Sequence, residues 1–335
     1  MMRVIVIVNR VEEIGPRQTT TMLITSCVQL GMTVVVASVD SFSIAGASGD
    51  NQLSVTGRLL PDPSTAGTDW KVTDTLGCCQ NSNSSRRQTF ELQSDDTLLI
   101  RTNPGRDQSR APLHDSFLDF CLVASDSGVR VINAPQRLKF MASKAVLSLI
   151  APRFRPPMVV SHDPSMLASF IRDSNVTCVA KPLVGSRGQD VIRIDPGEAA
   201  IEVTLSKTFG DRGIIVQHFV KGEQPGDQRV IVVNGRVLES DKHIAGIHRV
   251  PARGEFRANL HAGATAEPLL LDTHQRECLE HVGQLLTQFG IQLAGVDLIG
   301  DQVIELNVFS TGGLFDASRF AEIDFADLAV KKLLQ

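Results

Sequence analysis

Residues 294–308 read Ala-Gly-Val-Asp-Leu-Ile-Gly-Asp-Gln-Val-Ile-Glu-Leu-Asn-Val, with an apolar stretch on each side of a glycine. Side chains of alternating polarity are typical of two antiparallel strands that bury one shared face. A two-residue turn at Gly300 and Asp301 would mix polar and apolar side chains on both faces. A three-residue turn over Gly300–Gln302 separates them. Because a one-residue slip reverses every side chain, the pattern predicts the three-residue turn.

The predicted register sets Ile299 opposite Val303 and places two acidic side chains opposite each other. The apolar face of this hairpin then comprises Val296, Leu298, Ile304, Leu306 and Val308. Asp297, Glu305 and Asn307 share the other face, where two carboxylates and an amide oxygen form a ligand set that suits Mg²⁺. A solvated polar face is the alternative, and the lack of Lys or Arg between these residues favours the metal site.

The first third of the chain alternates short β-branched stretches with amphipathic ones. The pattern predicts strands at Arg3–Val8, Thr33–Ser38, Thr97–Arg101 and Val129–Ile132, and a helix over Pro16–Leu30. Strands that alternate with helices in this way form a mainly parallel sheet, so the predicted fold class is α/β, followed by smaller α+β lobes.

Three structural units are expected along the chain. An N-terminal α/β domain covers residues 1–133. Within it, residues 41–96 are expected to be irregular and partly mobile because they are rich in Ser, Gly, Asn, Asp and Thr, with one candidate short strand at Asn51–Leu60. A helix N-capped by Asn133 opens a central lobe over residues 134–212. A C-terminal lobe over residues 213–335 carries the acidic hairpin.

The composition is that of an ordinary folded protein: 42% of the residues are hydrophobic, 21% are charged, and the formal charge is −4. This balance provides no basic field, which disfavours nucleic acid as a partner. The sequence has no apolar run of about 18 residues, so no membrane span is expected. The first residues lack the apolar length of a signal peptide. We therefore expect a cytoplasmic protein, and the sequence leaves open whether it forms a homo-oligomer.

Phosphate binding is indicated by a lysine that precedes a glycine loop. Lys181 ends the predicted strand that starts at Thr177, where an unpaired ammonium would be costly to bury. The backbone amides of Gly185–Gly188 can cover phosphates, although an ordinary turn is the alternative. Lys144 lies before this segment, and a surface lysine is the alternative there.

Two other stretches offer groups for a nucleotide and a substrate. Ile215–Lys221 ends an apolar strand, and such an edge can present backbone groups to adenine; His218 within it is interpreted as packed or solvent-facing. Arg249–His261 contains three arginines. A solvated loop is one interpretation of this segment, and binding of a carboxylate and a transferring phosphoryl group is the other.

Taken in order, these segments resemble the ATP-grasp superfamily, within the branch of bacterial glutathione synthetases and ribosomal-protein-type glutamate ligases. The resemblance covers Asn133 to about Leu328, and the N-terminal third only in its βαβ form. The motifs that carry it are Val179-Ala-Lys-Pro-Leu183 with Gly185-Ser-Arg-Gly188, Gly226-Asp-Gln-Arg-Val230, Gly254-Glu-Phe-Arg-Ala-Asn-Leu-His261, Gly295-Val-Asp297 and Glu305-Leu-Asn-Val308.

By this resemblance, ATP and two Mg²⁺ ions bind between the last two lobes, which clamp the nucleotide. The residues implied to bind ATP are Lys144, Lys181, Gly185, Ser186, Arg187, Gly188, Gln217, His218, Phe219, Val220 and Asp227. The implied metal ligands are Asp297, Glu305 and Asn307. The implied catalytic residues are Arg229, Arg257 and Asn259, and the implied substrate contacts are Arg249, Ser310, Thr311, Gly312 and Gly313.

The reaction implied by the resemblance joins a small-molecule carboxylate to an amine. ATP phosphorylates the carboxylate, the amine attacks the activated carbonyl, and ADP and phosphate are released. The leading expectation is a glutathione-synthetase-like ligase that uses γ-glutamylcysteine and glycine.

Two segments depart from the glutathione synthetase pattern where substrate would be chosen. After Asn307, glutathione synthetases continue with a Ser-Pro-Thr type of loop and glutamate ligases with Ser-Pro-Gly, whereas Val308–Gly313 contains no proline. Arg101–Pro104 is only faintly similar to the acidic Asp-Pro-Pro segment of glutathione synthetases. An amino-acid ligase that acts on a peptide, a protein tail or a small metabolite therefore stays open, as does an ATP-binding regulatory protein without catalysis.

Overall fold

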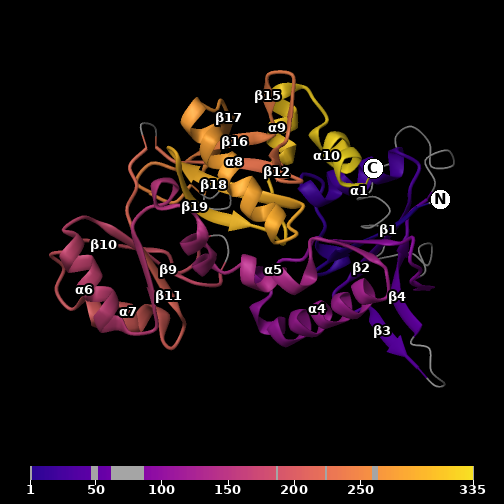
Figure 1. Cartoon of the computed structure of the whole chain (residues 1–335), viewed down its shortest axis with the longest axis horizontal. Helices are drawn as coiled ribbons and strands as arrows, with labels where there is room; N and C mark the ends of the chain where they lie inside the picture. The colour runs from indigo at the N-terminus through magenta and orange to yellow at the C-terminus, as the bar shows by residue number, and fades with distance from the viewer. Residues whose placement is uncertain are drawn as a thin grey trace.

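Three main β-sheets, each flanked by helices, follow one another along the chain (Figure 1). The computed structural model describes residues 2–46, 52–61, 87–185, 188–222, 225–258 and 263–334. None of the helices in these ranges has the length and apolar character that crossing a bilayer requires.

The N-terminal sheet has a parallel core in the order β2-β1-β6-β7. These strands are β1 (Arg3–Val8), β2 (Thr33–Ser38), β6 (Thr97–Ile100) and β7 (Arg130–Ile132). Successive apolar side chains of β1 point to opposite faces, so both faces are buried. Helix α1 (Thr19–Gln29) packs on one face and α4 (Ala111–Asp126) on the other. The predicted α/β fold class is confirmed.

An antiparallel extension completes this sheet on the side of β2. It consists of β3 (Phe42–Ala45), β4 (Gln52–Leu59) and β5 (Gln88–Glu91). The candidate strand at Asn51–Leu60 is confirmed as β4, whereas the expectation that the rest of residues 41–96 is irregular is wrong for β3 and β5. A Cβ atom at Gly57 would lie 2.6 Å from Val35 Cγ1, so glycine lets β4 approach β2 closely. Residues 47–51 and 62–86 lie outside the described residues.

The central sheet is antiparallel, in the order β10-β9-β11-β8. Its strands are β8 (Met158–Ser161), β9 (Cys178–Pro182), β10 (Ile192–Ile194) and β11 (Ile214–His218). Helices α6 (Pro164–Ser174) and α7 (Ile201–Phe209) cover one face. Since β11 pairs with β9, we propose that the central lobe ends after His218 and not at residue 212.

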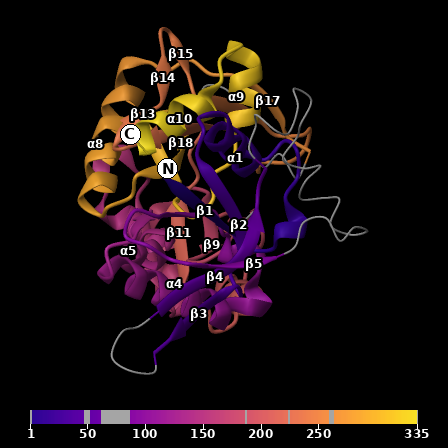
Figure 2. The same ribbon diagram turned by 90° about the vertical axis from the view of Figure 1, so that its right-hand side faces the viewer.

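The C-terminal lobe is built on the antiparallel order β17-β16-β12-β18-β19. Its strands are β12 (Asp227–Val233), β16 (Gly246–Val250), β17 (Thr265–Pro268), β18 (Leu293–Ile299) and β19 (Gln302–Asn307), with the short strands β13 (Arg236–Val237), β14 (Glu239–Ser240) and β15 (His243–Ile244). Helix α8 (Thr273–Gln288) packs on one face, and α9 (Leu314–Ala321) and α10 (Phe325–Leu334) pack on the other. Helix α10 also packs against α1, so the C-terminal end of the chain contacts the N-terminal domain (Figure 2).

The hairpin of β18 and β19 has the predicted acidic pair but not the predicted turn. Asp297 pairs with Glu305, as expected, whereas Ile299 pairs with Gln302 across a two-residue turn. A register shift beyond Asp297 absorbs the extra residue. As a result Val303 is buried in the core, and Ile304, predicted to face the core, lines a cleft instead.

The segment between the first two lobes contains α5 (Pro135–Met141) and short 3-10 turns. The turns that follow α5 are η5 (Lys144–Leu149) and η6 (Pro152–Phe154). Three other 3-10 turns lie in the N-terminal domain: η1 (Val11–Glu13), η3 (Pro104–Arg106) and η4 (Gln108–Arg110). The predicted cap of α5 is wrong, because Ala134 is the N-cap and has no side-chain hydrogen bond. The buried amide of Asn133 instead bonds to Gln292, Leu293 and Val308, which fixes the first domain to the C-terminal lobe.

Candidate active site

A cleft lies between the central sheet and the C-terminal lobe and encloses about 890 Å³, part of it open to solvent. β9 and β11 form one wall, and β12, β19 and the segment after β16 form the other. The sequence-predicted residues that line it are Lys144, Lys181, Gly185, Gly188, Gln217, His218, Phe219, Val220, Asp227, Arg249, Arg257 and Glu305. Residues far apart in the sequence therefore meet in one site.

Two lysines project into the cleft from different elements. Lys181 lies on the face of β9 opposite α6 and α7, and its ammonium lies 3.5 Å from the Ile304 carbonyl oxygen. Burial lowers the pKa of Lys181 to about 8. Within the described ranges no carboxylate lies within ion-pair distance of Lys181, as expected for a lysine that binds phosphate.

The second lysine, Lys144, starts the turn η5 and is buried, so the alternative of a surface lysine is wrong. Its backbone N–H donates to the Leu183 carbonyl, which holds η5 against the end of β9. Its ammonium lies 3.1 Å from Glu305 Oε1. Lys144 thus connects the central lobe to the acidic hairpin.

The predicted adenine edge lies at the end of β11. The backbone N–H groups of His218 and Phe219 are engaged by the carbonyls of Pro157 and Thr177. The side-chain amide of Gln217 is buried on the cleft wall, and neither its nitrogen nor its oxygen has a hydrogen-bond partner in the part of the chain that the structure describes. An amide that can donate and accept at once matches an adenine edge. His218 packs 5.5 Å from the Phe170 ring, and burial lowers its pKa, which agrees with a packed residue.

A buried ion network lies at the back of the cleft. Arg229 on β12 donates from Nε and Nη2 to the two oxygens of Asp297, at 2.7 and 2.6 Å. Arg249 on β16 donates from Nη2 to Asp297 at 2.8 Å and from Nε to Asp227 at 2.5 Å. The antiparallel pairs of β12 with β16 and with β18 bring these four side chains together.

The pKa values of the two carboxyl groups of this network are shifted in opposite directions. Burial would raise the pKa of Asp297, but the charges and hydrogen bonds of Arg229 and Arg249 outweigh burial and hold this pKa below its usual range. Burial raises the pKa of Asp227 to about 6, although Arg249 opposes the rise. Asp297 is therefore a buried anion bound by two arginines, and its role as a metal ligand stays a prediction.

A contact between the two lobes closes the cleft near the glycine loop. Arg257 Nη1 donates to the Gly188 carbonyl at 3.2 Å, and Arg257 Nη2 lies 2.7 Å from Glu255 Oε2. Hydrogen bonds from Arg257 lower the pKa of Glu255 to about 2, so this carboxylate is ionised near neutral pH. The predicted residues Ser186, Arg187 and Asn259 lie outside the described residues.

Comparison with known proteins identifies the family. Residues 145–322 match the sequence model of the prokaryotic glutathione synthetase ATP-grasp domain, which is more than half of the 335 residues. The chain belongs to this family. It is an ATP-dependent carbon–nitrogen ligase that forms ADP, and it uses ATP with Mg²⁺.

Relatives of this ATP-grasp ligase match well beyond the family domain. A glutathione synthetase of Nitrosomonas europaea is 30% identical over 251 residues, which cover 74% of this chain and 75% of that one. A glutathione synthetase of Synechocystis is 26% identical over 335 residues, 98% of each chain. The matches therefore include the N-terminal domain.

Solved structures show the same fold across nearly the whole chain. D-cycloserine synthetase DcsG has a TM-score of 0.62 at 16% identity and covers 98% of this chain and 99% of its own. The macrocyclase MdnC of Microcystis aeruginosa, bound with the precursor peptide MdnA, has a TM-score of 0.62 at 13% identity with full coverage of both chains. At such low identity these likenesses establish the ATP-grasp fold alone.

The donor groups at the hairpin of this ATP-grasp ligase fit Mg²⁺. The described ranges contain no group of three or more His, Cys, Asp or Glu side chains that could hold a metal ion. The donor set at the hairpin consists of two carboxylates and one amide. The nitrogen of the Asn307 amide is buried and has no hydrogen-bond partner among the described residues. Asp297 accepts three hydrogen bonds and keeps about one of its four lone-pair sites. Mg²⁺ binds through one or two carboxylates when phosphate oxygens complete its shell.

The predicted substrate loop, 310–313, is not part of the lining of the ATP cleft; it packs against β18 on the face that carries Asp297. A Cβ atom at Gly295 on β18 would lie 2.1 Å from Thr311 Oγ1, and one at Gly313 would lie 3.7 Å from Arg229 Cδ. The Thr311 carbonyl accepts a 2.7 Å hydrogen bond from Arg101 Nη2. The sequence pattern placed Arg101–Pro104 where substrate would be chosen but predicted no contact for the Arg101 side chain; the signal that could have found one is a charged residue directly after a buried parallel strand.

Proposed function

We propose that this ligase joins γ-glutamylcysteine to glycine with Mg·ATP, which makes it a glutathione synthetase. The observation that carries the proposal is the meeting of Lys144, Lys181, Glu305 and the Gln217 amide in one cleft. The identity to glutathione synthetases of two organisms supports the choice of substrates.

Each wall of the cleft has a part in the proposed reaction. The Gln217 amide orients the adenine, and the ammonium groups of Lys144 and Lys181 neutralise the phosphates. The cysteinyl carboxylate attacks the γ-phosphorus and displaces ADP. Glycine nitrogen then attacks the acyl carbon, loses a proton and expels inorganic phosphate, so one amide forms for each ATP consumed.

Two Mg²⁺ ions belong to this proposal. Glu305 and Asn307, with the remaining oxygen site of Asp297, would hold them together with the phosphate oxygens. When bound, the ions neutralise charge on the transferring phosphoryl group. Arg257, which already reaches Gly188 across the cleft, would face the same group.

The experiment that tests the proposal measures ADP release with Mg·ATP and γ-glutamylcysteine, with and without glycine. We expect glycine-dependent ADP release with glutathione formed in equal amount by mass spectrometry. ADP release that does not depend on glycine, or that yields no glutathione, would contradict the named substrates. A wild-type protein that does not bind ATP would contradict the assignment of this cleft as an ATP site.

The second candidate is an amino-acid ligase that acts on a peptide or another metabolite. The specific observation is the proline-free segment Val308–Gly313, which packs on β18 and contacts Arg101 from the N-terminal domain. A screen of amino acids and peptides as acid and amine would then show ADP release with a pair other than γ-glutamylcysteine and glycine. Tight ATP binding without turnover across that screen would instead favour a non-catalytic ATP-binding protein.

A further inference from the structure

The segment that follows β16 reaches the central lobe across the ATP cleft. Its residues Phe256, Arg257 and Ala258 line the cleft. The Phe256 ring meets the Phe219 ring edge-on, with 6.4 Å between their centroids. Arg257 Nη1 donates to the Gly188 carbonyl at 3.2 Å. The segment therefore contacts both the predicted adenine edge and the end of the glycine loop.

Glu255 comes just before these residues and is not part of the cleft lining. Its Oε1 accepts hydrogen bonds from the backbone N–H groups of Phe256, at 2.9 Å, and of Arg257, at 3.1 Å. Its Oε2 accepts a hydrogen bond from Arg257 Nη2 at 2.7 Å. One carboxylate thus holds both the backbone of Arg257 and its guanidinium, and it does so from behind the cleft wall.

The guanidinium of Arg257 keeps one donor for a ligand. Its Nη2 and Nη1 donate to Glu255 and Gly188, whereas its Nε is buried and has no hydrogen-bond partner among the residues that the structure describes. A buried donor without an acceptor is unfavourable, and native proteins leave few such groups. Because Arg257 lines the ATP cleft, an acceptor that binds in the cleft can pair with this N–H.

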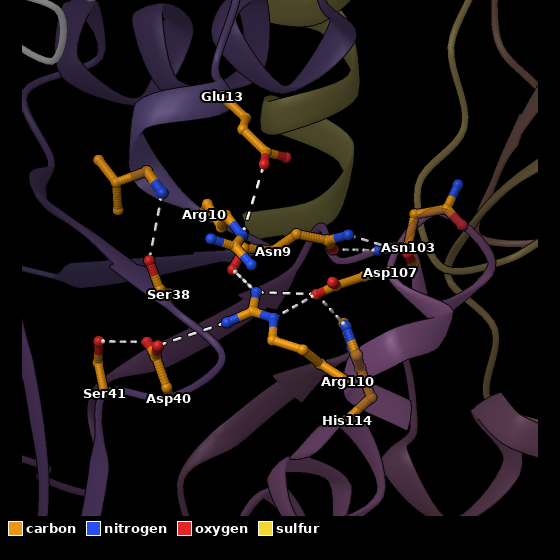
Figure 3. A network of polar contacts seen from close by, with 11 residues as sticks. Asn9, Arg10, Glu13, Ser38, Asp40, Ser41, Asn103, Asp107, Arg110 and His114 are labelled. Atoms are coloured by element: carbon orange, nitrogen blue, oxygen red, sulfur yellow. Dashed lines mark hydrogen bonds and ion pairs between the residues drawn. The ribbon is translucent and has the colours of Figure 1, made fainter. Parts of the chain in front are cut away.

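Another arginine of this chain shows a local carboxylate pair in which every nitrogen is engaged (Figure 3). Arg110 lies 2.8 Å from Asp107, three residues before it, and donates to the same carboxylate from Nε at 2.9 Å. Its Nη2 also donates to the Asn9 carbonyl at 2.8 Å, and its Nη1 donates to Asp40 at 3.4 Å. All three nitrogens of Arg110 therefore have an acceptor in the protein. The unpaired Nε of Arg257 departs from this pattern and points to a ligand.

Folding stability does not account for the pair of Glu255 and Arg257. Their side chains are 25% and 35% exposed, and ion pairs at such positions contribute little to the free energy of unfolding. What the pair does restrict is the direction of a long and flexible side chain. A side chain that is ordered before its ligand arrives loses less entropy on binding, which favours the bound state.

We propose that Glu255 is a positioning residue that holds the Arg257 guanidinium in the ATP cleft for the γ-phosphate of ATP. The inference rests on the role proposed above for Arg257 and names the side chain that orients it. Arg257 donates to a γ-phosphate oxygen from Nε, and Glu255 acts only through Arg257. Loss of Glu255 therefore weakens the recognition of the γ-phosphate when Arg257 is present, and has no effect on it when Arg257 is absent.

The test measures binding by calorimetry, without turnover. The probes are ADP and the non-hydrolysable β,γ-imido analogue of ATP, each with Mg²⁺, and the readout is the Kd of the analogue divided by the Kd of ADP. We expect Arg257→Ala to raise this ratio by roughly 10-fold or more, the value of a charge-assisted hydrogen bond. Glu255→Ala and Glu255→Gln should each raise it by at least about threefold and leave the Kd of ADP within twofold.

The matched control is Glu198→Gln. Glu198 Oε1 accepts a hydrogen bond from the backbone N–H of Asp195 at 2.8 Å, as Glu255 does from its own neighbours, but Glu198 is exposed and does not line the cleft. The ratio should stay within twofold of wild type in this variant. Circular dichroism checks that each variant is folded, and Glu255→Gln keeps the shape of the side chain where Glu255→Ala does not.

A double-mutant cycle separates positioning from a direct or structural role. In the Arg257→Ala background, Glu255→Ala should leave the ratio within twofold. An effect of Glu255→Ala that persists in that background, an equal loss of ADP and analogue binding, or a ratio unchanged by either Glu255 variant would overturn the proposal. A ratio unchanged by Arg257→Ala would overturn it as well. Neither probe contains the acid or the amine substrate, so a failure of γ-glutamylcysteine and glycine as substrates leaves this result unaffected.

Discussion

Replacement of Glu305 by alanine or glutamine is expected to lower kcat by roughly 10²–10³-fold, the usual cost of removing a group that stabilises transition-state charge. Glu305 pairs with Asp297 across the hairpin and lies 3.1 Å from Lys144 in the ATP cleft. Both variants remove the carboxylate that we propose to hold Mg²⁺, so less positive charge would face the transferring phosphoryl group, and glutamine keeps the shape of the side chain. The measurement is steady-state ADP release at saturating ATP and Mg²⁺.

The matched control is Glu277→Ala, because Glu277 is half exposed and pairs only with surface Arg153 among the described residues. It should keep kcat within twofold. Circular dichroism at the assay temperature checks that both Glu305 variants are folded, since either change leaves Lys144 without its partner. A folded Glu305→Gln protein with kcat within tenfold of wild type would contradict the proposed role of Glu305 as a metal ligand.

Asp297→Asn is expected to destabilise the protein by roughly 3–5 kcal/mol, because it leaves two buried guanidinium groups without their shared anion. Arg229 and Arg249 both donate to Asp297, which is 1% exposed. The variant keeps the shape of the side chain and removes the charge, so the loss reports the ion network. Urea unfolding followed by circular dichroism gives the change in the free energy of unfolding.

The control is Asp115→Asn, in which an exposed carboxylate loses its surface partner Lys139. It should change the free energy of unfolding by less than about 1 kcal/mol. The pKa of Asp297 is held below its usual range, so its stabilisation is complete above about pH 5, beyond the ordinary aspartate pKa, and is lost as the pH falls through the folded value. An Asp297→Asn protein as stable as the control would contradict the network.

The sequence predicted those features of the active site that depend on local pattern. Alternating apolar residues located the acidic hairpin, and period-two packing put Asp297 opposite Glu305. The order of lysine and glycine loop predicted that Lys181 and Gly188 bind phosphate, and in the structure both residues line one cleft. These predictions needed only the strand period and the cost of burying an unpaired charge.

What the sequence missed depends on contacts between distant segments. The turn was predicted one residue too long, because a register shift in β19 lets Val303 enter the core, which apolar alternation cannot reveal. Asn133 was expected to cap a helix, yet its amide bonds to strands about 160 residues further on. The ion pairs of Asp297 with Arg229 and Arg249 were not predicted, because these two arginines come from separate strands.

The central claim is that this ligase activates a carboxylate by phosphoryl transfer before an amine attacks it. The direct measurement uses an acid substrate with both oxygens of the reacting carboxylate labelled with ¹⁸O, γ-glutamylcysteine first. Mass spectrometry of the released phosphate reads the outcome. We expect one ¹⁸O atom in each inorganic phosphate, with the other retained in the amide. Phosphate released during amide formation without any ¹⁸O would contradict it.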